Sequence, residues 1–561
     1  MMPEEPIGAE RSTMMKRARA ILLAAVMVMG LFASMTPASA QASGSELTVA
    51  VGYQFTTFDP ALNTEISNSY VLTHLYSGLF RKGPEGEVIN DLCERYEVTE
   101  DGLVYTFHLV PDALWSDGMP VSAYDFEYSY LRTLSYGVEN AWAINDFVNF
   151  IEGAEEYSAA ALAAGESFDC TKADHDSVGI RALDNTTLVL TLKTPCVYLT
   201  GLMVSSSVWL PVRVDYAVQH DSMWAFDGGY PTNGAYTLTA CNETEKAVLT
   251  KNEKYRFAGD VTMDTITFLC MADEDAQAMA YRTEEIDVAL GISTETAVSY
   301  EGSDELWLMP QPSNYFLAIN SGSTGPEWAK DVNVRRALAL AINKDAVVSV
   351  LGGQLFYPVL NGYVPDGIAG VEDSFRNEGD ADGYTLVYDP AQAMALLADA
   401  GYDASHPLHI VYKYTNSGIH SNVATMLQQM WKAVGVDVEC RGVESAAFYD
   451  QLDQGDFEIA RYGYGAVDNA IQYLELWTIG RQVVPAVEVP EFDQMLADAR
   501  ELADPVEFNN ALHAAEDYLV EENVYVIPLF NFNTPALVQP YVHGCTMAGI
   551  YPYFAFVTLS E

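Results

Sequence analysis

The chain has 561 residues and a formal net charge of −50, and 49% of its residues are hydrophobic. A chain of this length exceeds what one hydrophobic core serves, so we expect two or three domains. The hydrophobic content excludes a disordered protein, and the strong negative charge argues against binding to nucleic acid or to anionic lipid.

The first forty residues have the pattern of an export signal. Residues 21–36 form a long apolar run, which Lys16, Arg17 and Arg19 precede and Ala38-Ser39-Ala40 follows. The run is too short for a membrane anchor, and its flanks are typical of a secretory signal peptide. We therefore expect residues 1–40 to be removed and the protein to be exported, periplasmic or extracellular, and soluble. No cysteine lies near the cleavage site, so we expect no lipid anchor.

The stretch that follows predicts a strand at Leu47–Val51, a turn at Thr57–Pro60 and a helix at Ser67–Phe80. After the next two glycine-rich turns, Val98–Thr133 holds the most informative motif of the chain. Within it, Leu103–Val110 alternates apolar and polar residues, as a half-buried strand does.

A turn at Asp117-Gly118 separates that strand from a helix. Ser122 is placed to cap the helix, and Asp125 stands at the third helical position, where a capping box carries an acid. Phe126 and Tyr130 lie on the apolar face of the helix. The motif therefore predicts a strand, a turn and a capped helix in that order.

Further along, residues 139–170 are Ala-rich and predict helix. Strands are predicted at Thr186–Leu192, Ala247–Thr250 and Thr265–Leu269. Gly234, in the segment Thr232–Leu238, allows a main-chain geometry that a side chain would block.

The second half alternates helices with short strands, which favours a mixed sheet covered by helices. Asp331 and Asp389 are placed as helix caps, and Gly401 is placed to end a helix. The last helix is predicted at Glu507–Tyr518, and a buried strand at Val524–Phe530.

Motifs of common enzymes are missing: the sequence has no G-x-S-x-G elbow, no phosphate-binding loop and no H-E-x-x-H. We therefore expect neither an enzyme nor a cofactor. His406 and His409 are a weak metal candidate, because His409 starts a predicted strand. Residues Glu378–Asp389 imitate a calcium loop, but Asp389 is better used as a helix cap, so we expect no metal.

The seven cysteines leave two interpretations open. Export permits disulfides, and Cys170–Cys196 or Cys241–Cys270 are candidates to pair across neighbouring strands. Buried free thiols are the other interpretation. No C-x-x-C occurs, so neither a redox dithiol nor a zinc ribbon is indicated.

The stretch most suited to binding is Phe457–Tyr473, F-E-I-A-R-Y-G-Y-G-A-V-D-N-A-I-Q-Y. Its first four residues are strand-like. Gly463 and Gly465 then leave main chain open to whatever lies beside the strand, and Asp468 follows.

The W-S-D-G-x-P-V-x-A-x-D-F-x-Y-S motif within Val98–Thr133 resembles the signature of family 5 of the extracellular solute-binding proteins, which serve oligopeptide and dipeptide ABC transporters. Leu75–Phe80 and Thr232–Leu238 are similar to two further segments of that family. Glu284–Asp287 is similar to its R-x-G-E-I-D helix end, with Glu284 at the usual glycine position. The resemblance covers nearly the whole chain after residue 40.

The resemblance implies a peptide site in the stretch Phe457–Tyr473. Main chain at Gly463, Gly465 and Ala466 would pair with an extended peptide, and Tyr464 would replace the usual tryptophan. Asp468 would hold the peptide α-ammonium, although an ungapped match places Val467 there. A solvated turn is the alternative for this aspartate.

The same resemblance assigns four further residues. Arg461 matches a position that binds the peptide carboxylate in some relatives, with a structural salt bridge as the alternative. Ile66, Trp142 and Phe532 fall where relatives line the cleft, and each has core packing as its alternative.

The implied fold is an α/β, two-lobed periplasmic-binding-protein-like fold of type II. We expect a lobe I core from 46–77, 204–305 and 534–561, an extra subdomain from 78–203, and lobe II from 306–533. The implied protein is a monomer that closes by a hinge on a peptide and delivers it to a membrane ABC permease. Alternatives are a binding protein of the same fold for a nickel chelate, haem, glutathione, an oligosaccharide or an opine-like solute, and a secreted adhesin or hydrolase.

Overall fold

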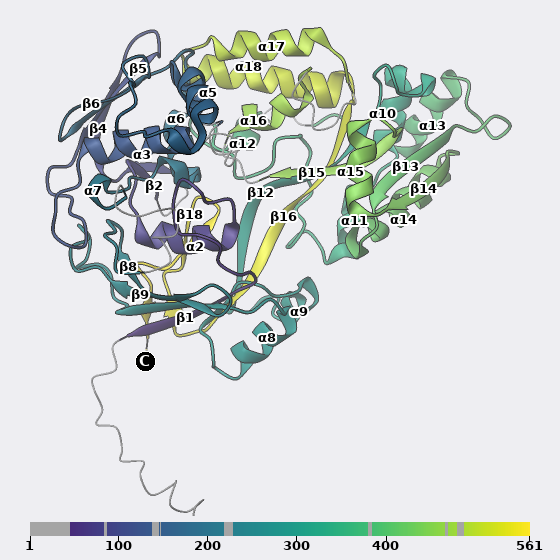
Figure 1. Ribbon diagram of the computed structural model, residues 1–561. Helices are drawn as coiled ribbons and strands as arrows, with labels where there is room; N and C mark the ends of the chain where they lie inside the picture. The colour runs from purple at the N-terminus through teal and green to yellow at the C-terminus, as the bar shows by residue number, and fades with distance from the viewer. Residues whose placement is uncertain are drawn as a thin grey trace, which may run out of the picture. The chain divides into compact units, whose positions relative to one another are not determined.

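The computed structural model (Figure 1) describes residues 45–83, 87–136, 145, 147–217, 228–379, 384–465, 469–479 and 487–560. Its strands are β1 Glu46–Val51, β2 Phe80–Lys82, β3 Val88–Asn90, β4 Cys93–Val98, β5 Val104–Leu109, β6 Ile180–Asp184, β7 Thr187–Thr191, β8 Tyr236–Asn242, β9 Lys246–Lys251, β10 Thr265–Cys270, β11 Val288–Ala289, β12 Leu306–Ile319, β13 His409–Thr415, β14 Asp437–Val443, β15 Ile459–Gly465, β16 Val526–Val538, β17 Val542–His543, β18 Thr546–Ala548, β19 Tyr551–Tyr553 and β20 Thr558–Leu559.

The helices lie between these strands. They are α2 Ile66–Leu75, α3 Ala123–Ser135, α5 Ala154–Ala164, α6 Leu199–Ser205, α7 Val214–Ala217, α8 Glu274–Arg282, α9 Thr294–Val298, α10 Val332–Leu340, α11 Lys344–Leu351, α12 Phe375–Gly379, α13 Pro390–Asp399, α14 Gly418–Ala433, α15 Ser445–Asp453, α16 Ala470–Leu474, α17 Pro490–Arg500 and α18 Pro505–Asp517.

One ten-stranded mixed sheet organises the chain, with the strand order β14-β13-β15-β12-β16-β11-β1-β10-β9-β8. The pairs β1–β11, β13–β14 and β13–β15 are parallel, and the other neighbours are antiparallel. The predicted mixed sheet with helices on it is thus confirmed.

Strands β12 and β16 are the long central pair of this sheet (Figure 1). The half of β16 that ends at Val538 pairs with β11, whereas β12 pairs with β15 from Ser313 to Ile319. The register between β12 and β16 shifts between Gln311 and Asn314, so a bulge marks the middle of the pair.

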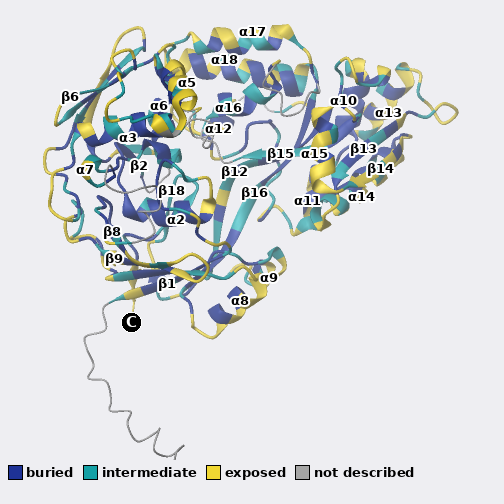
Figure 2. Ribbon diagram, in the orientation of Figure 1, coloured by how far each residue is buried: buried dark blue, intermediate teal, exposed yellow. Residues whose placement is uncertain are grey.

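The hydrophobic core is divided along these two strands, and β16 is buried toward both of its ends (Figure 2). Met309 of β12 belongs to the large cluster that also contains β1 and the subdomain of β4–β7. Leu317 packs with helices α10, α11 and α14, whereas Phe316 packs with α16, α17 and α18. Because β12 and β16 contribute to all three clusters, they connect otherwise separate cores.

The motif at Val98–Thr133 folds as predicted. Strand β5 and helix α3 follow one another, and the Ser122 N–H donates to Asp125 Oδ2 at 2.9 Å. Phe126 and Tyr130 are fully buried, and the buried Trp115 indole donates to the same Asp125 oxygen at 3.4 Å. The capping acid therefore also fixes the tryptophan turn, which explains this motif as scaffold.

Helix α2 is shorter than predicted, because it ends at Leu75 and not at Phe80. The Gly234 N–H donates to Leu75 O at 2.9 Å, and Asn233 Oδ1 accepts from the Ser77 N–H at 3.1 Å. A Cβ at position 234 would lie 2.6 Å from Tyr76 N. A segment more than 150 residues away thus ends the helix, and Gly234 is needed for that close approach.

The predicted caps are present. Asp331 Oδ1 accepts from Asn333 N at 2.9 Å, and Asp389 Oδ1 accepts from Gln392 N at 2.9 Å. Gly401 ends α13 with φ of 91°. Asp389 and Glu378 are therefore engaged within the protein, since the Glu378 carboxylate accepts main-chain N–H groups of residues 371–373. Residues 380–383 of the calcium-loop candidate lie outside the described residues.

Cysteines and histidines give no metal or disulfide signal in the described chain. All seven cysteines are free thiols. His409 Nδ1 lies 2.8 Å from Asp437 Oδ2 on the neighbouring strand β14, and no group of three or more candidate metal ligands occurs among the described residues.

Among the helices that the structure describes, none combines the length and the apolar composition that a membrane span requires. The predicted signal peptide, residues 1–40, lies outside the described part.

Candidate functional site

The candidate site begins at strand β15, because part of one edge of this strand has no neighbouring strand. We call this part the open edge of β15. On one side β15 pairs with β12 from Ile459 to Gly465. On the other side β13 pairs with it only at Ile459 and Ala460 among the described residues. From Arg461 to Gly465 the main chain therefore has a strand on one edge only.

The alternation of main-chain groups decides which residues face that edge. The Tyr464 N–H donates to Asn314 Oδ1 of β12 at 3.0 Å, so Tyr464 is turned toward β12. Since successive residues of a strand alternate, the N–H and C=O groups of Gly463 and Gly465 point away from β12. This is the geometry that an added extended chain requires.

Packing against β12 also explains why both of these positions are glycine. A Cβ at Gly463 would lie 2.8 Å from Asn314 O, and one at Gly465 would lie 2.4 Å from the Ser313 Cβ. Strand β12 thus lies so close to β15 here that neither position admits a side chain. The predicted glycines are required by the scaffold as well as suited to main-chain recognition.

Arg461 lies at the start of the open edge. Its Nη2 donates to Thr415 Oγ1 at 2.7 Å and to the Tyr449 hydroxyl at 3.4 Å, and its guanidinium stands 5.5 Å from the centre of the Phe448 ring. The buried Nε has no hydrogen-bond partner among the described residues. None of the described carboxylates forms an ion pair with Arg461, so the salt-bridge alternative finds no partner there.

His420, in the first turn of α14, stands beside this arginine. Its ring centroid lies 5.6 Å from that of Tyr315 on β12, and its buried Nδ1 has no hydrogen-bond partner among the described residues. Burial, and then the charge of Arg461, lowers the pKa of His420 to about 4. A neutral imidazole and an arginine without an acidic partner together make a site suited to an anionic group.

Ile66 lines a second part of the site, on the other side of the sheet's midpoint. Here a cavity of about 320 Å³ is bounded by the start of α2, the β12 and β16 strands and the β18–β19 hairpin. Ile66 is 49% exposed, so core packing does not account for it. The cavity is also lined by Tyr53, Tyr70, Gln277, Met309, Gln311, Thr534 and Tyr551.

Phe532 lies directly beside this cavity on β16. It pairs in register with Gln311, which lines the cavity, and it is only half-buried. Its ring packs edge-on against Tyr357 and Phe530, with centroids 5.9 Å and 5.4 Å away. The aromatic cluster thus holds Phe532 at the bulge between β12 and β16.

Three predicted site residues, Trp142, Ala466 and Asp468, lie outside the described residues. Tyr464 is described and packs edge-on against Tyr473, at 5.5 Å. His420 is not among the site residues predicted from the sequence, although it lies eleven residues after His409, where a strand is predicted to start. Only its position next to Arg461 in space gives it a place in the site.

Known proteins agree with this architecture. Residues 87–482 match the model of "Bacterial extracellular solute-binding proteins, family 5 Middle". The periplasmic oligopeptide-binding protein OppA of Escherichia coli strain K12 is 28% identical, with 88% of each chain covered. The probable deoxycholate-binding periplasmic protein YgiS of the same strain is also 28% identical, with 87% of each chain covered.

Among solved structures, the periplasmic murein tripeptide-binding protein MppA in its unliganded open form superimposes with a TM-score of 0.78. It is 24% identical, and 92% of this chain and 98% of that chain are covered. The two-lobed α/β fold expected from the signature motif is thus confirmed. With a family model that matches most of its length, the chain belongs to family 5 of the bacterial extracellular solute-binding proteins.

Proposed function

We propose that this protein captures peptides outside the membrane and delivers them to a membrane ABC permease. The observation that carries the proposal is Arg461, which has no acidic partner among the described residues and lies where the open edge of β15 begins. A peptide supplies both what this arginine lacks, a carboxylate, and what the edge lacks, a neighbouring strand. OppA, a relative that is 28% identical, is named for oligopeptide binding.

In this proposal the peptide main chain pairs with Gly463, Gly465 and Ala466, and its carboxylate meets Arg461 beside His420. Asp468 holds the α-ammonium. Tyr464 and the cavity-lining residues Ile66, Trp142 and Phe532 supply walls. Pairing of main chain to main chain does not depend on the peptide sequence, and water completes the contacts of varied side chains.

The proposal includes a hinge at β12 and β16. These strands connect the separate hydrophobic cores, and the bulge after Gln311 interrupts their register. We place the lobe I core at 46–77, 204–305 and 534–561, the extra subdomain at 78–203 and lobe II at 306–533. Closure of two lobes on a ligand needs only a few strand residues to change conformation. The protein acts by binding and not by catalysis, as an exported monomer.

Calorimetry with a free and a C-terminally amidated tripeptide tests the carboxylate contact. Wild-type protein should bind the free peptide more tightly, and Arg461→Gln should remove most of that difference. A charge-assisted hydrogen bond contributes about 1.5–3 kcal/mol, so a preference of roughly ten- to a hundredfold is expected. Arg441→Gln, at an exposed arginine paired with Glu439, is the matched control. Equal affinity of the two peptides for the wild type would remove Arg461 from the site.

The ammonium contact is tested with Asp468→Ala and an N-acetylated peptide. An unpaired buried ammonium costs on the order of 3–5 kcal/mol, so the free peptide should lose about two to four decades of affinity. The acetylated peptide should bind both proteins equally. Asp399→Ala, at an exposed position of α13, is the control. Unchanged affinity in Asp468→Ala would assign this aspartate to a solvated turn.

A further inference from the structure

Asn314 of β12 connects the open edge of β15 to the interior of the fold. It is the first residue after the bulge of β12, it pairs in register with Tyr464, and it is fully buried. Its Oδ1 accepts from the Tyr464 N–H at 3.0 Å, and its Nδ2 donates to Tyr363 O at 2.6 Å. One side-chain amide therefore holds two main-chain segments that are far apart in the sequence.

The contact with Tyr464 decides the direction of a neighbouring carbonyl. The Gly463 C=O and the Tyr464 N–H belong to one peptide group, which is planar and trans, so they point in opposite directions. Because Asn314 holds the N–H toward β12, the Gly463 carbonyl points to the open edge of β15. This carbonyl is the acceptor that a main-chain N–H of an added extended chain would use.

The segment behind this amide is itself fixed. The N–H groups of Tyr363 and Val364 both donate to Glu516 Oε1, each at 2.7 Å. Glu516 Oε2 accepts from Arg376 Nη2, and both of these side chains are buried. A buried ion pair between α12 and α18 thus holds the segment to which the asparagine donates, so its amide is fixed on both sides.

The glycines of β15 make this contact important for binding. Tyr464 is flanked by Gly463 and Gly465, and glycine loses more conformational freedom on ordering than any other residue. Among the described residues, this part of β15 has a neighbouring strand on one edge only. A hydrogen bond that orders the strand before the ligand arrives reduces the conformational entropy that is lost on binding.

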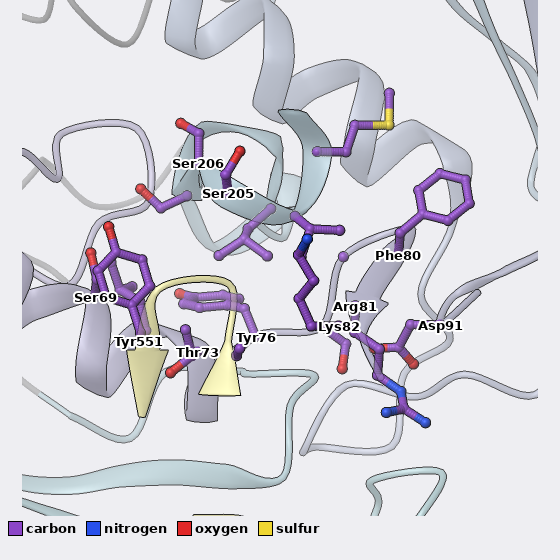
Figure 3. Close-up of a pocket in the computed structure, with 18 of the residues that line it drawn as sticks. Ser69, Thr73, Tyr76, Phe80, Arg81, Lys82, Asp91, Ser205, Ser206 and Tyr551 are labelled. Atoms are coloured by element: carbon purple, nitrogen blue, oxygen red, sulfur yellow. The ribbon is translucent and has the colours of Figure 1, made fainter. Parts of the chain in front are cut away.

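The pocket beside α2 differs from this edge, because its polar groups are engaged within the protein. It holds about 80 Å³ and lies between α2, strand β2 and helix α6 (Figure 3). Its Ser205 hydroxyl donates to carbonyl groups of its own helix, Gly201 O at 3.1 Å and Leu202 O at 3.2 Å. Figure 3 shows Arg81 and Asp91 on the same side of this pocket, and the charge of Arg81 acts on Asp91. These groups serve the scaffold, whereas the open edge of β15 has main chain that faces outward.

We propose that Asn314 is a positioning residue for ligand capture. Its side-chain amide orients the Gly463 carbonyl so that this carbonyl accepts a main-chain N–H of the bound peptide. The inference rests on the proposed peptide capture and adds to it a residue that the ligand does not touch. Asn314 acts through the peptide group between Gly463 and Tyr464, because its own side chain is enclosed.

Calorimetry with amide and ester analogues of alanine-based tripeptides to pentapeptides tests this role. In each ester analogue an oxygen replaces one main-chain N–H, which removes that donor, and the replacement is moved along the peptide. At the position that pairs with Gly463, wild type should bind the amide about two- to tenfold more tightly than the ester. Asn314→Leu, which has a similar volume but no amide, should bind the amide peptide more weakly and bring this ratio close to one.

Asn531→Leu is the matched control. Asn531 of β16 is also buried and pairs in register with Asn314, but β16 lies on the opposite side of β12 from β15. This variant should keep the wild-type ratio. Asn314→Ser, whose hydroxyl is one bond shorter than the amide, covers the case that Asn314→Leu does not fold, and it should also lose the preference. A preference that stays at its wild-type value in both Asn314 variants, while amide and ester bind equally more weakly, would overturn the proposal.

Hydrogen exchange of main-chain N–H groups, followed by NMR in the ligand-free protein, tests the orientation without a peptide. The Tyr464 N–H should exchange more slowly than those of Gly463 and Gly465, and Asn314→Ser should accelerate only the Tyr464 exchange. Equal protection of the three groups in wild type would overturn the proposal.

The two measurements also separate this proposal from peptide capture. A wild type that binds peptides without an amide preference at any position would overturn the role of Asn314 and leave peptide capture standing. A wild type that binds no peptide would instead contradict the proposed function, and the exchange of the Tyr464 N–H would still test Asn314.

Discussion

Arg132 donates hydrogen bonds from both terminal nitrogens to the carboxylate of Asp59, and this ion pair is buried. Asp59 lies in the turn after β1, and Arg132 lies in the last turn of α3, within the signature motif. The Asp59 side chain is fully buried and also accepts from the Ala61 N–H at 3.1 Å. The pair thus ties the motif to the first strand of the sheet.

Breaking this pair should be strongly destabilising. Asp59→Asn leaves the Arg132 charge buried without its partner, so the free energy of unfolding should fall by about 3–5 kcal/mol. Urea unfolding followed by circular dichroism measures this change. Adding Arg132→Met to Asp59→Asn should recover part of the loss, because the unpaired charge is then gone.

The exposed pair Arg181–Asp176 is the control for that experiment. Its nitrogen and oxygen are 2.8 Å apart, but the aspartate side chain is 89% exposed. Asp176→Asn should cost less than about 1 kcal/mol. Equal effects of the two substitutions would mean that burial of the Asp59–Arg132 pair is energetically unimportant.

His74 should make stability depend on pH. Its Nδ1 lies 2.7 Å from Tyr70 O, and its Nε2 accepts from the Phe554 N–H at 2.9 Å, which fixes the C-terminal segment to α2. Burial lowers the pKa of His74 from 6.5 to about 4. The unfolded chain therefore binds the proton first, and stability falls as the pH is lowered from 6.5 through 4, by about 3 kcal/mol in total.

Unfolding at pH 7 and pH 5 in wild type and His74→Gln measures this contribution. The difference in stability between the two proteins should be largest at pH 7 and shrink at pH 5. A difference between wild type and His74→Gln that stays constant with pH would show that His74 does not titrate in this range.

Glu284 adopts a left-handed backbone, with φ of 58°, where the family motif has glycine. A side chain in this conformation is strained by about 1–2 kcal/mol, and substitution by glycine relieves that strain. The greater conformational entropy of glycine in the unfolded chain offsets part of the resulting gain in stability. Glu284→Gly should therefore raise the free energy of unfolding by roughly 0.5–1 kcal/mol. Glu285→Gly, one residue later and without positive φ, should lower it. If thermal unfolding showed Glu284→Gly to be less stable than Glu285→Gly, the backbone of Glu284 would not be strained.

Because the seven cysteines are free, the number of thiols that react with Ellman's reagent can be predicted. Burial raises the pKa of Cys93 to about 11 and those of Cys241 and Cys545 to about 12. These thiols should react slowly with Ellman's reagent in the native protein, because the thiolate is the reactive form. In denaturant, without reductant, all seven should react. A count of five that rises to seven after reduction would reveal a disulfide.

Local features of the fold were predictable from a few neighbouring residues. The Ser122–Asp125 capping box, the cap at Asp389 and the alternation in β5 are decided by hydrogen bonds and burial within one element. The motif Val98–Thr133, which contains the capping box and β5, identified the family, and it proved to be scaffold. Gly463 and Gly465 were expected to leave main-chain N–H and C=O groups exposed, and their geometry is compatible with that role.

The sequence by itself determined the family, the two-lobed architecture and most helix and strand positions, because periodicity and capping act over short distances. The tertiary structure decided the early end of α2, the approach of His420 to Arg461 and the open edge of β15. Each of these depends on how segments distant in the chain pack together. Spacing along one chain does not encode such distances, whereas hydrogen bonding and burial in the folded protein fix them.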